Sequence, residues 1–156
     1  MANFDTNAGA TFSVSAAAPT TYDDNVTTGY PSLTFTPATA AEITNYNGPN
    51  PEWSTTTDNT YNTSDKADRK SSRALGTCDI TLNYLSTNSA FWDIIDTAEL
   101  SKSAVLSVQF SHSNGSDLQW YTVQIVQSGK TYGGPDDFET RQIMMLAQTD
   151  IVAGTV

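Results

Sequence analysis

Apolar and polar residues alternate along several stretches of the chain, as they do in strands that bury one face. The alternation is visible in TFSVSA at 11 to 16 and in SLTFT at 32 to 36. It is longest in TCDITLNYL at 77 to 85, where every second residue from Cys78 to Tyr84 is apolar. Threonine and aromatic residues, which favour strands, recur in the same stretches. The sequence therefore predicts a mostly β protein.

The spacing of the apolar residues becomes helical between about 88 and 99. Phe91, Ile94 and Ile95 recur at intervals of one helical turn, and the acidic residues between them face away. Asn88 is a residue type that caps the first turn of a helix. We therefore expect one amphipathic helix in this region.

The stretches AVLSVQF and LQWYTVQIVQ alternate on either side of an Asn114-Gly115 turn, which predicts a β-hairpin. The later stretch ETRQIMMLAQTDI carries apolar residues at consecutive positions around 143 to 146. Consecutive apolar residues are typical of a strand buried on both faces. We expect this stretch to be the final strand of the fold.

Two regions, 17 to 31 and about 45 to 76, show neither period and are expected to be irregular. The second is rich in polar residues and too long for an ordinary connection, and loops of that size are usually functional or disordered. We expect residues 1–156 to form one domain that carries this long polar loop.

The charge is unevenly distributed, with 17 acidic and 7 basic residues giving a net charge of -10. Such a balance argues against a nucleic-acid-binding protein, because affinity for phosphates comes mainly from Lys and Arg. No apolar run is long enough for a membrane helix, and the N-terminus has no secretory leader pattern, so we expect synthesis in the cytoplasm.

No group of residues indicates catalysis, a cofactor or a metal ion. His112, the single histidine, falls beside the predicted hairpin turn without a nucleophile pattern. Cys78 is the single cysteine and is interpreted as a small core residue. Trp92 and Trp120 belong to the predicted helix and hairpin, where core packing is usual. A carbohydrate-binding module is therefore supported only by Trp53.

Four features follow one another along the chain: an early strand pair, a long polar stretch, a strand that leads into a lone helix, and a hairpin closed by a glycine-rich acidic turn. They are TFSVSA with SLTFT, WSTTTDNTYNTSDKADRKSSRALG, TCDITLNYLSTNSAFWDIIDTAEL, and GGPDDFETRQIMMLAQTD. This order resembles the tail tube (major tail) proteins of long-tailed bacteriophages over most of the chain. In that family a similar turn precedes a terminal strand, and Gly134, Asp136, Asp137 and Phe138 stand at the matching place.

The resemblance implies a β-sandwich or half-barrel with one flanking helix, completing a β-barrel ring on oligomerisation. Hexameric rings would stack into the tail tube of a virion, with other tail proteins at the tube ends. Double-stranded DNA would pass through the lumen during ejection without specific binding. The same fold occurs in tail terminators and in the tube of type VI secretion, so a terminator or a secretion-tube component is an alternative, as is a carbohydrate-binding β-sandwich.

A wall that lets DNA slide should lack positive charge. Residues 53 to 76 contain four basic and three acidic side chains, whereas the rest of the chain contains three basic and fourteen acidic ones. We expect a neutral or acidic lumen that Lys102, Lys130 and Arg141 do not line. The segment 53 to 76 is expected to order on contact with acidic surface of a neighbouring subunit. The candidate contact residues are Trp53, Tyr61, Lys66, Arg69, Lys70 and Arg73.

Overall fold

The computed structural model describes residues 9–38, 43–58, 67–112 and 117–155. Over these residues the chain forms ten strands, one α-helix and two 3₁₀ turns, Tyr30–Ser32 and Ser86–Asn88. The strands are β1 (Thr11–Ser15), β2 (Thr36–Pro37), β3 (Ile43–Asn47), β4 (Glu52–Asp58), β5 (Ala67–Ala74), β6 (Thr77–Asn83), β7 (Leu106–Ser111), β8 (Asp117–Thr131), β9 (Thr140–Ala147) and β10 (Val152–Thr155), and the helix α1 spans Ser89–Leu100.

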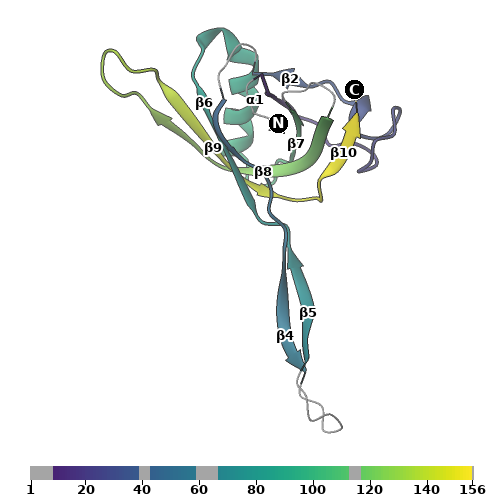
Figure 1. Cartoon of the computed structure of the whole chain (residues 1–156). Helices are drawn as coiled ribbons and strands as arrows, with labels where there is room; N and C mark the ends of the chain where they lie inside the picture. Colours follow the sequence, from purple (N-terminus) through teal and green to yellow (C-terminus); the bar gives the residue numbers. More distant parts are fainter. Residues whose placement is uncertain (1–8, 39–42, 59–66, 113–116, 156) are drawn as a thin grey trace, which may run out of the picture.

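Eight strands form one antiparallel sheet in the order β2-β1-β7-β8-β9-β6-β3, with β10 added to the edge of β8. The sheet curves around α1, which packs mainly against β8 and also against β1 and β2 (Figure 1). A register shift between Ile125 and Gln127 places a bulge in β8, and bulges increase local bending. The mostly β half-barrel with one flanking helix, expected from the sequence, is therefore confirmed.

The core lies between the sheet and α1. Alternate residues of β6 and β9 face it, and from α1 Phe91 and Ile95 are fully buried. The Phe91 ring packs edge-on against the rings of Phe12 and Trp92, with centroids 6.1 Å and 5.0 Å away. Burying each large apolar side chain stabilises the fold by about 1.5–3 kcal/mol. The alternation that predicts β1 and β6 is therefore the pattern of core contact.

The helix and the main hairpin follow the sequence expectation closely. The predicted helix at 88 to 99 is observed at Ser89–Leu100. Asn88 stands at its N-cap position but makes no side-chain capping bond. Strands β7 and β8 pair antiparallel as predicted, although the Asn114-Gly115 turn itself lies outside the described residues.

Two strand predictions are wrong. The stretch 32 to 36 is not a strand, because Pro31 enters a 3₁₀ turn at Tyr30–Ser32 and pairing begins only at Thr36. Strand β9 is buried on one face only, and β10 follows it, so β9 is not the final strand. Its consecutive apolar residues divide between the two faces, which leaves Met144 and Leu146 exposed at 41% and 40%.

The region expected to be a long irregular loop contains three strands. Strand β3 joins the main sheet beside β6, and β4 pairs with β5 as a separate antiparallel hairpin. This β4–β5 hairpin projects away from the sheet and the helix (Figure 1). It has no apolar alternation because neither face packs on a core, so the period of a buried strand is absent from its sequence.

Candidate assembly surfaces

The β4–β5 hairpin is attached to the body at its root. The Arg73 guanidinium forms an ion pair with the carboxylate of Asp150, which follows β9 in the same chain. Gly76 has φ +85° at the point where the hairpin leads into β6, and a Cβ there would lie 2.9 Å from the carbonyl oxygen of Asn50. Glycine is therefore required where the two chain segments cross at the root.

One face of the hairpin combines an exposed aromatic ring with a cation. Trp53 is 45% exposed, and the Lys70 Nζ lies 5.4 Å from the centroid of its ring. Thr55 pairs with Lys70 across the strands and is also exposed. This face therefore offers an apolar ring and an ammonium group together.

The structure separates the residues that sequence reasoning grouped as one contact surface. Arg69 pairs with Thr56, one position from the Thr55–Lys70 pair, so it faces the opposite side of the hairpin from Lys70. Arg73 pairs with Asp150 of its own subunit at the root. The remaining two candidates, Tyr61 and Lys66, lie outside the described residues.

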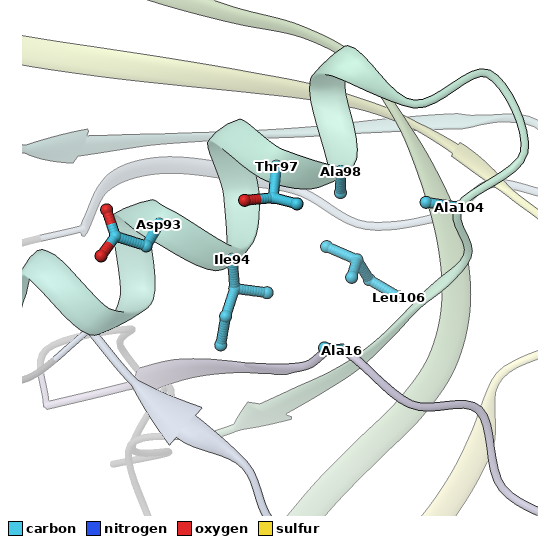
Figure 2. A pocket seen from close by; sticks show the side chains of 7 residues that line it. All are labelled: Ala16, Asp93, Ile94, Thr97, Ala98, Ala104 and Leu106. Carbon is cyan, nitrogen blue, oxygen red and sulfur yellow. The ribbon is translucent and has the colours of Figure 1, made fainter.

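A surface groove of 380 Å³ lies between α1 and the strands that flank its C-terminal half (Figure 2). Ala98 and Ile94 of α1 form one wall, and Asp93 stands at one end. The groove is lined by Ala16, Asp93, Ile94, Thr97, Ala98, Ala104 and Leu106. Its three alanines leave an apolar hollow beside a carboxylate. Sequence reasoning missed this groove, because its residues come from three separate segments.

Over β3, β6, β9 and the part of β8 that pairs with β9, the sheet face that points away from α1 is polar and carries little charge. Asp79 of β6 lies at its centre, where it accepts hydrogen bonds from the side-chain amides of Asn47 (2.9 Å) and Gln142 (3.1 Å). Apolar side chains of Val126, Met144 and Leu146 lie beside Asp79 along a shallow depression. We call this surface, on β3, β6, β9 and the part of β8 that pairs with β9, the outer sheet face.

Cations are absent from the described outer-face residues of these four strands. The cross-strand pairs place Thr77, Asp79, Thr81 and Asn83 of β6 on this face opposite Leu146, Met144, Gln142 and Thr140 of β9. Arg141 faces the other way: it is buried, lies over the rings of Tyr84 (3.8 Å) and Trp92 (4.9 Å), and pairs with Glu139 at 3.4 Å. Lys130 pairs with Arg141 across the strands and so lies on the same side.

Buried titratable groups meet in the core between β3, β6 and β8. The hydroxyls of Tyr46 and Tyr121 are 2.6 Å apart, and burial raises the pKa of Tyr46 to about 12. Burial also raises the pKa of Cys78 to about 12, an effect that a hydrogen bond with Tyr121 partly offsets. Cys78 is 3% exposed, so its interpretation as a core residue is confirmed.

The tryptophans divide as the sequence indicated. Trp92 is buried in the core, and Trp120 is buried on the opposite face of β8, where its ring stacks on that of Tyr30 with centroids 6.2 Å apart. Trp53 is exposed on the hairpin. In the described part of the chain, no three His, Cys, Asp or Glu side chains gather as metal ligands would. Among the same residues, no helix has the length and apolar character needed to cross a membrane.

Similar folds occur in assemblies of contractile injection systems. A chain of the six-fold symmetrised baseplate of the anti-feeding prophage (AFP) has a TM-score of 0.56 and 9% identity, covering 98% of this chain and 97% of that one. A chain of the PVC sheath/tube terminator in the extended state has a TM-score of 0.55 and 9% identity, and the match covers 91% of this chain and 91% of that one. A chain of the AFP tube terminating cap has a TM-score of 0.52 and 12% identity, and the match covers 93% of this chain and 88% of that one.

At these identities the likeness shows the fold. No protein-family model matches the chain, and neither does any curated protein sequence. The resemblance to a tail-like fold, inferred from the order of elements, is therefore supported. The likeness does not single out the tail tube family of long-tailed bacteriophages.

Proposed function

We propose that this chain is a structural subunit of a tail tube, which assembles into rings that stack around a lumen. The observation that carries the proposal is the open curved sheet. Among the described residues, its terminal strands β2 and β3 each pair on one side only. Exposed strand edges favour pairing with another chain, and closure into a ring removes them. The fold that the chain shares, over nearly its whole length, with parts of contractile injection systems supports this role.

In this proposal six subunits form a ring, and the outer sheet faces join as a barrel wall with α1 on the outside. A baseplate solved with six-fold symmetry contains a chain of the same fold, which supports that number. The particle is the tail of a virion, made in the host cytoplasm, and other tail proteins close the two ends of the tube.

The proposed lumen is suited to the passage of double-stranded DNA. DNA carries about one negative charge per ~1.7 Å of its axis, so a basic wall would hold it by releasing counterions. The described outer sheet face has one carboxylate, Asp79, and otherwise amides, hydroxyls and a few apolar side chains. Such a wall attracts DNA little and lets it slide. The subunit acts as a passive conduit rather than an enzyme.

Electron microscopy of the purified protein tests the proposal. We expect rings with a central hole that stack into tubes, and a hexamer by light scattering. A protein that remains monomeric up to millimolar concentration, with well-folded circular dichroism, would contradict it.

A tail terminator is the second candidate, because two of the similar folds come from structures of a terminator and a terminating cap. The same images separate the two roles. A tube protein forms stacks of many rings, whereas a terminator forms single rings that do not stack with themselves.

We also propose that the β4–β5 hairpin makes the contact between rings, through Trp53, Tyr61, Lys66, Arg69 and Lys70. Reversing Arg69 and Lys70 to Glu is expected to leave the subunit folded and to shorten or abolish the tubes. High salt should weaken wild-type tubes, because exposed ion pairs are screened. Tubes of the double variant that match wild type in length and salt resistance would contradict this contact.

A further inference from the structure

We propose that the groove beside α1 receives Trp53 and Lys70 of a second copy of this chain, in the next ring of the tube. The inference rests on the proposed function and assigns its missing half: the surface on which the hairpin docks. It follows from the chemistry of the groove, the chemistry of the hairpin face, and the placement of the two on the subunit.

The groove has the shape and the polarity to hold a flat apolar ring beside a cation. Its walls are small or aliphatic side chains, and its 380 Å³ opens at the surface. Asp93 stands at one end of the groove (Figure 2). Lys102 is the basic residue nearest in sequence, and it lies beyond the end of α1. A partner segment should therefore carry an aromatic ring together with a positive charge.

Trp53 and Lys70 have these properties. An aromatic side chain of this size buries about 150–250 Å² when it packs fully, whereas Trp53 is 45% exposed in the subunit. The Lys70 Nζ, 5.4 Å from the ring centroid, keeps hydrogen-bonding capacity toward a carboxylate. Aromatic anchors of this kind, inserted into pockets, carry most of the energy of protein interfaces.

The two surfaces cannot meet within one chain. Helix α1 lies on the concave side of the curved sheet, whereas the hairpin projects away from the other side (Figure 1). A contact between different surfaces of identical subunits is heterologous, so each copy offers both halves and the contact repeats from one copy to the next. Repetition along an axis builds a stack, and repetition around each ring multiplies a weak contact sixfold if the ring is a hexamer.

A disulfide trap tests the placement directly. Thr55 is exposed on the hairpin beside Lys70, and Thr97 is exposed at the groove. Under oxidation, the variant with Thr55→Cys and Thr97→Cys should form a ladder of covalent oligomers on a non-reducing gel. The native Cys78 is buried and does not compete. The control variant, with Thr55→Cys and Gln127→Cys on the outer sheet face, should remain monomeric on the gel.

Charge exchange tests the chemistry of the contact. Lys70→Glu or Asp93→Lys alone should raise the protein concentration needed for stacking at least about tenfold, and the two together should restore it toward wild type. Trp53→Ala should raise it by a similar factor. The matched controls are Lys130→Glu and Tyr132→Ala, which change an exposed cation and an exposed ring on the β8–β9 hairpin. Neither control should alter stacking.

Ring formation, measured by light scattering on the same samples, separates this inference from the proposed function. Rings that form in every variant but stack only with an intact hairpin and groove support both. Rings that stack equally well in all variants, or a control pair that cross-links as well as the test pair, overturn the docking inference. Ring formation, and with it the proposed function, would still hold. Rings that form in no sample, with no covalent ladder, overturn both.

Discussion

The curved sheet with its helix and the β4–β5 hairpin are both built from antiparallel strand pairs, yet only the sheet buries a core. Inside the sheet, Tyr121, Phe12 and Ile80 are fully buried. Along the hairpin, every described side chain from Trp53 to Thr57 is exposed. An isolated two-stranded hairpin is marginally stable in water. The body is therefore stabilised by its own packing, whereas the hairpin buries no core of its own.

The largest expected effect is a loss of stability of the sheet and helix. Phe91→Ala removes a fully buried ring that contacts Phe12 and Trp92, and such changes cost about 3–5 kcal/mol. The free energy of unfolding, measured by chemical denaturation, should fall by that amount. Trp53→Ala on the hairpin is the matched control and should change it by less than about 0.5 kcal/mol. Equal losses from the two variants would show that the hairpin shares the core.

A second effect on the body is its loss of stability at high pH. Burial raises the pKa values of Tyr46 and Cys78 to about 12 in the folded chain, whereas tyrosine and cysteine in an unfolded chain have pKa values of about 10 and about 8.5. The raised values favour the neutral groups, so the stability is complete below about pH 8.5 and is lost as the pH rises toward 12.

Denaturant titrations between pH 8 and pH 12 should show a decline of several kcal/mol. Tyr46→Phe removes one of these groups and should make the decline shallower. A profile that remains flat to pH 12 would mean that these groups are open to solvent, contrary to the burial of Cys78.

The smallest expected effect concerns the root of the hairpin. The Arg73–Asp150 pair is partly exposed, and such pairs contribute about 0.2–1 kcal/mol. Arg73→Ala should therefore change global stability little. Amide hydrogen exchange should become faster in β4 and β5 and stay the same in β6 and β9. Arg73→Lys keeps the charge, so its exchange rates in β4 and β5 are expected to lie between those of wild type and those of Arg73→Ala. A loss close to that of Phe91→Ala would instead place the pair in the folding core.

The sequence predicts those parts of the fold that bury one face against the core. In strand β6 every second residue is apolar and buried. In helix α1 the buried apolar residues recur every three to four positions, so both elements have a clear period. Leu33 and Phe35 also alternate, but two residues cannot outweigh Pro31, which fixes a turn before them. Met144 and Leu146 led to the wrong prediction of a strand buried on both faces, because an apolar residue on an exposed face looks the same in sequence as a buried one.

The candidate assembly surfaces could be predicted only in part. The cluster of basic residues between 53 and 76 marks the hairpin, but Arg69 and Lys70 are consecutive residues of a strand and therefore point to opposite faces. The groove depends on the way in which Ala16, Ile94 and Leu106 meet in space, and alanine carries no local signal for a hollow. Contacts of this kind depend on tertiary packing rather than on any single segment.

The length of β8 has a mechanical consequence. Its fifteen residues span about 50 Å, and they are bonded to β7 on one edge and to β10 and then β9 on the other. A pull along this strand loads the flanking ladders in shear, so many hydrogen bonds must rupture at once instead of opening one after another. The subunit therefore contains an internal tie, which resists extension most strongly along the direction of β8.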